Sequence, residues 1–94
     1  MAAEKVSAEL YVEGRVQGVG YRFFTERAAA RYDIKGWSMN LPDGRVMLEI
    51  EGEKKHVEKF IKELEKGPTM SRVESVNVRW KPFQDRFNGF HIKF

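Results

Sequence analysis

The sequence predicts an α+β fold, an antiparallel sheet with two helices packed on one face. Two observations predict it. Apolar residues alternate with polar ones in several short segments, as in half-buried strands, and recur at helical spacing in two longer segments. Along the chain the order is strand, helix, strand, strand, helix, strand, followed by one further strand.

The first strand is predicted to begin at Ala8, because apolar or small residues occupy every second position from there to Val16. Residues 1–7 are expected to form a loosely ordered lead-in. A first helix is predicted from Tyr21 to about Asp33. Its apolar stripe consists of Tyr21, Phe24, Ala28 and Tyr32.

Residues 34–52 are predicted to form a hairpin. Its turn is Leu41-Pro42-Asp43-Gly44, in which proline sets φ and the Asp-Gly pair tolerates a chain reversal. A second helix is expected after Gly52 and should end at Gly67-Pro68. Its apolar face consists of Val57, Phe60, Ile61 and Leu64.

The next strand is marked by the alternation of Val76, Val78 and Trp80. Val73 is out of phase with these residues, which indicates a bulge or a late start to the strand. After a polar loop over 83–89, residues 90–94 alternate again and predict a final strand.

This order predicts the ferredoxin-like arrangement of two split β-α-β units, in one domain spanning residues 1–94. Right-handed crossovers place the first and third strands side by side in the centre of the sheet. Trp37, Phe24 and Phe60 are assigned to the core. The fold hosts many functions and does not by itself indicate one.

Composition narrows the functional classes. The 94 residues include no cysteine, which excludes disulfides, thiolate metal sites and a cysteine nucleophile and suits a cytoplasmic protein. There is no apolar run long enough for a membrane span or a signal peptide, so neither a membrane nor export is expected. The net charge of +3 suits a small anionic ligand and is too weak to indicate nucleic acid. A monomer is expected.

The stretch Gly14-Arg15-Val16-Gln17-Gly18-Val19-Gly20-Tyr21-Arg22 stands between the first strand and the first helix. Glycines at such a junction allow a tight turn that points several N–H groups at one spot. The positive end of the helix favours an anion there, and Arg22 adds a planar charged fork that suits phosphate or carboxylate. The stretch therefore predicts an anion-binding cradle.

The chain lacks the residues that several other kinds of binding or catalytic site require. The chain has neither a nucleotide P-loop nor the third glycine of a dinucleotide fingerprint. His56 and His91 belong to no ligand cluster, so no metal and no cofactor are expected. Serine and threonine have no evident histidine partner for a hydrolytic triad. Six glutamates are expected to form a solvated face: Glu49, Glu51, Glu53, Glu58, Glu63 and Glu65.

Two segments taken together resemble the paired signature motifs of the acylphosphatase family. The first is the glycine-rich stretch of residues 14–22, and the second is Gly36-Trp37-Ser38-Met39-Asn40-Leu41-Pro42-Asp43-Gly44-Arg45-Val46. The resemblance extends over nearly the whole chain. It implies a metal-independent cytosolic hydrolase that cleaves the carboxyl–phosphate bond of small acyl phosphates, with inorganic phosphate as product and inhibitor.

The resemblance also implies roles for individual residues. Arg22 matches the family's phosphate-binding arginine, and Asn40 matches its water-positioning asparagine. The loop between the first strand and the first helix would supply backbone donors to the substrate. These substrate-binding positions are Gln17, Gly18, Val19, Gly20 and Tyr21. The chain departs from the family pattern at Tyr21, Ser38 and Met39.

Two alternative functions remain open from the residues. An RNA-recognition module has the same element order, and Leu10-Tyr11-Val12 is similar to its first motif. It needs stacking aromatic residues on the third strand, where this chain has Arg45, Met47, Glu49 and Glu51. The other alternative is a non-catalytic domain that binds carbamoyl or acyl phosphate. Ninety-four residues leave no room for a second catalytic domain, which favours the free-standing enzyme.

Overall fold

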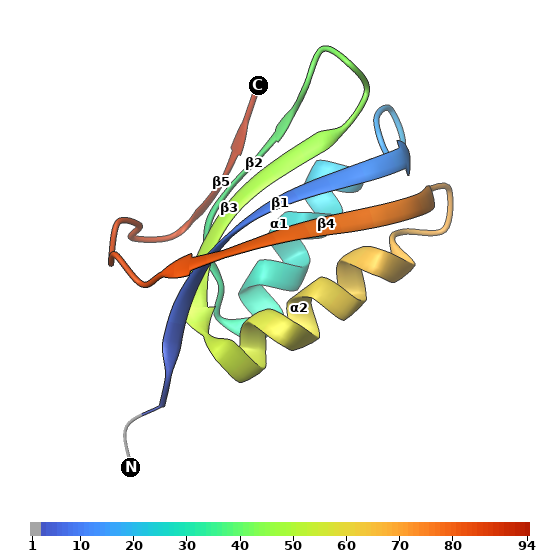
Figure 1. The fold of residues 1–94 in the computed structure, drawn as a ribbon. Helices are drawn as coiled ribbons and strands as arrows, with labels where there is room; N and C mark the ends of the chain where they lie inside the picture. The colour runs from blue at the N-terminus through green and yellow to red at the C-terminus, as the bar shows by residue number, and fades with distance from the viewer. Residues whose placement is uncertain (1–2) are drawn as a thin grey trace.

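The computed structural model describes residues 3–94 and confirms the predicted fold class. Its elements are β1 (Lys5–Arg15), α1 (Tyr21–Tyr32), β2 (Lys35–Asn40), β3 (Val46–Glu53), α2 (Lys54–Lys66), β4 (Arg72–Pro82) and β5 (Phe90–Lys93). The five strands form one sheet in the order β4-β1-β3-β2-β5, with β1 and β3 adjacent as predicted. Both helices cover the same face of this sheet (Figure 1). Within residues 3–94, neither helix is long and apolar enough to cross a membrane.

The first strand begins earlier than the sequence predicts. Lys5, Val6 and Ser7 lie in β1 and pair with the end of β3, so the expected lead-in does not extend to residue 7. Ser7 is buried, and its hydroxyl is satisfied by donating to Glu51 (2.8 Å), a partner that lies 44 residues away along the chain. Residues 1 and 2 lie outside the described residues.

The phase shift at Val73 is a bulge, as predicted. Glu13 pairs with Ser75 while Gly14 pairs with Val73, so Glu74 is the extra residue on β4. β4 begins at Arg72, before the bulge, so a late start does not explain the shift.

The core lies between the sheet and the two helices. Leu10, Leu48 and Phe60 are fully buried there, and Phe24 packs against them. The assignment of Trp37 to the core is wrong. Alternation along β2 turns Gly36 and Ser38 toward the helices, so Trp37 lies half-buried on the opposite face, with the ammonium of Lys93 4.2 Å from its ring centroid.

The final strand differs in direction from the other four. The pairs β1–β3, β1–β4 and β2–β3 are antiparallel, whereas β5 runs parallel to β2. β4 ends at the end of the sheet where β1 and β2 begin, and the loop over 83–89 stays at that end (Figure 1). A strand that starts from this end of the sheet must run in the direction of β2.

The loop over 83–89 is held by Glu51, which therefore does not belong to a solvated face. Glu51 is 2% exposed, and its carboxylate accepts hydrogen bonds from the backbone N–H groups of Gln84 (3.2 Å), Arg86 (2.8 Å) and Phe87 (3.3 Å). Burial alone would raise the pKa of Glu51, but these donors and the Ser7 hydroxyl together hold it below its ordinary value. The prediction failed because the covering loop comes from a distant part of the chain.

Candidate active site

The two sequence motifs meet at one end of the sheet. The loop between β1 and α1 lies beside the turn between β2 and β3 (Figure 1). The side-chain amide of Gln17 joins them, because it donates to the carbonyls of Leu41 (2.8 Å) and Arg45 (2.9 Å). The glycine-rich loop is thus tied to the turn that directly follows Asn40.

We expect Gln17→Ala to destabilise the fold by about 1–2 kcal/mol, because it removes two hydrogen bonds that tie the glycine-rich loop to the turn, although each carbonyl keeps one backbone donor. The measurement is the free energy of unfolding in urea. Gln84→Ala is the control, since Gln84 is exposed at the other end of the sheet. Equal stability of the two variants would show that the Gln17 amide is not a clamp.

The loop before α1 presents its backbone to open space. Gly18 (φ 73°) and Gly20 (φ 76°) adopt left-handed conformations that other residues rarely tolerate. A Cβ atom on either glycine would meet nothing within 4 Å among the described residues. The two glycines therefore shape the turn while leaving room for a ligand against it.

The start of α1 is arranged for an anion. Gly20 is its N-cap, and within residues 3–94 no side chain caps the helix. Phe24 N–H donates to Gly20 O (3.0 Å), so the N–H groups of the residues before it precede the first intrahelical bond. With no acidic residue in the first turn, the positive end of the helix is left for a ligand.

Arg22 and Asn40 line the same pocket beside the start of α1. Its volume is about 180 Å³, and its lining residues are Val16, Gly18, Gly20, Tyr21, Arg22, Phe23 and Asn40. The pocket therefore brings together an arginine, an asparagine and the start of a helix, although Arg22 and Asn40 are 18 residues apart along the chain.

Arg22 is oriented by the end of the chain. Its Nη1 donates to the carbonyl of Lys93 (2.9 Å), and its guanidinium carbon lies 4.6 Å from the centroid of the Phe94 ring. A neutral carbonyl and one aromatic face leave most of its five N–H donors available to a ligand.

A buried contact fixes the start of α1 relative to β2. The Thr25 hydroxyl donates to the carbonyl of Arg22 (2.6 Å) and lies 3.0 Å from the hydroxyl of Ser38. Thr25 and Ser38 are both fully buried. Ser38, a departure from the family pattern, thus belongs to the link between the segments that carry Arg22 and Asn40.

Asn40 contains a buried polar atom that lacks a partner. Its Oδ1 accepts no hydrogen bond from any residue in the described range 3–94. A buried acceptor left unsatisfied costs about 1–3 kcal/mol, so a site for an incoming O–H donor is the physical expectation.

The predicted substrate-binding residues divide into two groups. Gly18, Gly20 and Tyr21 line the pocket, whereas Gln17 clamps the turn and Val19 packs against the core. The phenol of Tyr21 is buried and donates to Leu64 O (2.7 Å), and this burial raises its pKa, so it remains neutral. Tyr21 can therefore offer the pocket its backbone but not its hydroxyl.

Sequence reasoning missed three contacts at the site. Phe23 lines the pocket, and Lys93 and Phe94 contact Arg22. Phe23 could have been found because it is an aromatic residue outside the apolar stripe of the first helix. No local pattern could have connected Arg22 to a segment 71 residues away.

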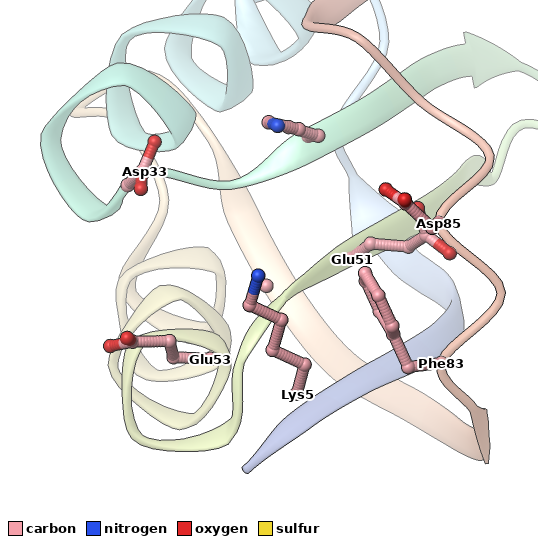
Figure 2. Close-up of a pocket in the computed structure, with 8 residues that line it drawn as sticks. Lys5, Asp33, Glu51, Glu53, Phe83 and Asp85 are labelled. Atoms are coloured by element: carbon pink, nitrogen blue, oxygen red, sulfur yellow. The ribbon is translucent and has the colours of Figure 1, made fainter. Parts of the chain in front are cut away.

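A second pocket of about 170 Å³ lies at the opposite end of the sheet (Figure 2). Its lining residues are Lys5, Asp33, Lys35, Glu51, Gly52, Glu53, Phe83 and Asp85. The buried carboxylate among them, that of Glu51, is already occupied by Ser7 and the backbone of the loop over 83–89. Across residues 3–94, no three metal-ligating side chains cluster in a way that could hold a metal ion. The pocket beside Arg22 is therefore the better candidate.

Comparison with known proteins agrees with this choice. A family model described as acylphosphatase matches residues 8–92. The chain belongs to the acylphosphatase family. The match begins in β1 and ends at Ile92, the third residue of β5. It therefore includes both motifs.

Acylphosphatases of known sequence and structure match over most of their length. The acylphosphatase of Salinibacter ruber is 46% identical over 90 residues, which cover 96% of this chain and 93% of that protein. The crystal structure of acylphosphatase from Bacillus subtilis superposes with a TM-score of 0.91 at 30% identity and covers 95% of this chain and 99% of that one. The same fold also forms part of a longer protein, since full-length HypF matches with a TM-score of 0.86 over 12% of its chain.

Proposed function

We propose that this acylphosphatase hydrolyses small acyl phosphates with Arg22 binding the phosphoryl group and Asn40 positioning the attacking water. Family membership supports the activity. One observation carries the residue roles: Arg22 and Asn40, whose buried Oδ1 lacks a partner among residues 3–94, line a single pocket beside an uncapped helix start.

The chemistry requires little beyond binding and orientation. Water attacks phosphorus in line, the P–O bond to the acyl group breaks, and the carboxylate leaves with the bonding electron pair. A carboxylate is a good leaving group and needs no proton from a general acid. The protein must therefore hold a dianionic phosphoryl group and stabilise the charge on its equatorial oxygens.

The parts of the pocket suit these tasks. The Arg22 guanidinium and the N–H groups at the start of α1 can donate to the phosphoryl oxygens. The Asn40 carbonyl oxygen can accept a hydrogen bond from the water and so orient a lone pair of the water oxygen toward phosphorus. The proton released by the water passes to a phosphoryl oxygen, which leaves as part of inorganic phosphate.

The direct test is hydrolysis of benzoyl phosphate, followed by ultraviolet absorbance, with and without EDTA. We expect turnover that is unchanged by the chelator and is inhibited competitively by inorganic phosphate. Loss of activity with EDTA would contradict the metal-independent mechanism, and absence of turnover would contradict the proposed activity.

Asn40→Ala should lower kcat by about 10–100-fold, because the attacking water loses its orientation. Inhibition by phosphate should weaken by less, since Arg22 and the helix start remain. The measurement is kcat and the phosphate inhibition constant, with exposed Asn88→Ala as the control. A larger change in phosphate affinity than in kcat would assign Asn40 to binding instead.

We further propose that the enzyme works as a monomer in the cytoplasm. The two residues proposed to act on the substrate, Arg22 and Asn40, line one pocket of the same chain, so a second copy need not supply either role. A chain without cysteine is chemically suited to a reducing compartment. Sedimentation of the active enzyme would test the monomer.

A further inference from the structure

Phe23 is a large apolar side chain that is not buried. It is 54% exposed, although it belongs to α1, whose buried face packs on the sheet. It follows Tyr21 by two residues and so lies about 200° around the helix from that buried side chain. Its position is therefore outside the core stripe, and packing does not account for a phenyl ring there.

The exposed ring lies beside the anion-binding parts of the site. Phe23 lines the same pocket as Arg22 and Asn40 and directly follows Arg22 in the first turn of α1. The other apolar residues on the pocket wall, Val16 and Tyr21, are buried, so Phe23 is the apolar lining residue that contacts solvent. The pocket thus has a charged part and, next to it, an apolar surface that contacts solvent.

We infer that Phe23 contacts the acyl group of the substrate and makes the enzyme prefer aromatic over short aliphatic acyl phosphates. This inference rests on the proposed function. Arg22 and the helix start hold the phosphoryl end of the substrate, so the acyl end projects from the cradle past the next side chain of α1. An aromatic acyl group there removes apolar surface of both partners from water, whereas an acetyl group covers little of the ring.

The contact has a defined kinetic signature. The acyl group keeps its shape and apolar character while the P–O bond breaks, so Phe23 binds it equally in the ground state and the transition state. Interactions of that kind change KM and leave kcat unaltered. Phe23 is therefore a specificity-determining residue, unlike Arg22, which acts on the charge of the transition state.

The test compares Phe23→Ala with wild type on benzoyl phosphate and acetyl phosphate. We expect KM for benzoyl phosphate to rise about 5–10-fold with kcat within about 2-fold of wild type. KM for acetyl phosphate and the inhibition constant of inorganic phosphate should both change by less than about 2-fold, because neither ligand reaches the ring. Phe23→Leu, which keeps an apolar contact, should give an intermediate KM for benzoyl phosphate.

Phe83→Ala is the matched control, since Phe83 is also exposed (37%) but lines the pocket at the opposite end of the sheet (Figure 2). It should leave all four constants unchanged. If Phe23→Ala raised KM equally for both substrates, or changed KM for neither, the role of Phe23 would be overturned. The proposed function would not be affected by either result. Absence of wild-type turnover on both substrates would overturn the proposed function and this inference with it.

Discussion

Arg22→Ala is expected to lower kcat/KM for benzoyl phosphate by about 10²–10³-fold, the usual cost of losing one preorganised donor to transition-state charge. Inhibition by inorganic phosphate should weaken in parallel, because the same guanidinium binds the product. The physical reason is that the pocket beside the helix start contains one permanently charged side chain, Arg22, among its lining residues. Steady-state kinetics on benzoyl phosphate with and without phosphate would measure both effects.

Arg22→Lys separates charge from geometry. An ammonium keeps the charge but lacks the planar fork, and it cannot both donate to Lys93 O and bind phosphate in the same way. We therefore expect a loss close to that of Arg22→Ala. Arg27→Ala is the control, because Arg27 is exposed on the same helix and lines a different pocket. Wild-type turnover in either Arg22 variant would disprove the assignment.

Glu51→Gln is expected to lower the free energy of unfolding at pH 7 by about 2–4 kcal/mol, because it replaces a buried carboxylate that four donors satisfy. A neutral amide offers one acceptor oxygen, and its N–H₂ group faces backbone N–H groups that cannot accept a hydrogen bond. The loop over 83–89 and the start of β5 should loosen first. Urea unfolding of both proteins would measure the difference.

The difference should depend on pH with a defined sign. The pKa of Glu51 is lower in the folded protein than in the unfolded chain, so the ionised carboxylate stabilises the fold above about pH 4.3, the ordinary glutamate value. This stabilisation is lost as the pH falls through the folded pKa. Glutamine at this position does not titrate. The difference in the free energy of unfolding between wild type and Glu51→Gln should therefore be largest near pH 7 and should become smaller in acid.

Glu49→Gln is the matched control on the same strand and the same face. Glu49 forms partly exposed ion pairs with Lys81 (3.6 Å) and Arg86 (2.7 Å), which should be worth less than about 1 kcal/mol. Equal destabilisation by the two variants, or a Glu51→Gln effect that is the same at pH 3 and pH 7, would contradict the buried anchor.

The two glutamates illustrate a limit of reading a strand by itself. Glu49 and Glu51 occupy equivalent positions in the alternation of β3, and both face away from the helices. The Glu49 side chain stays 17% exposed beside its ion pairs. Glu51 is fully buried, because the loop over 83–89 crosses the sheet at Glu51. The alternation determines which face of the sheet a side chain lies on, but not whether a distant segment of the chain covers that side chain.

The sequence by itself determined the element order, the fold class and the turns. These depend on local physics: the period of apolar residues, the conformations open to glycine and proline, and the chain order that constrains strand pairing. The bulge at Val73 was also visible locally, as a break in alternation. Arg22 and Asn40 could be named from their motifs before any geometry was known.

The tertiary structure alone decided which groups surround those residues. It brought Arg22 to Lys93 and Phe94, paired Thr25 with Ser38, and left the Asn40 oxygen without a partner. It also directed β5 parallel to β2 and placed Trp37 outside the core. The common physical reason is that these contacts join residues far apart in sequence, so they depend on how the loops close and which faces meet rather than on any local period.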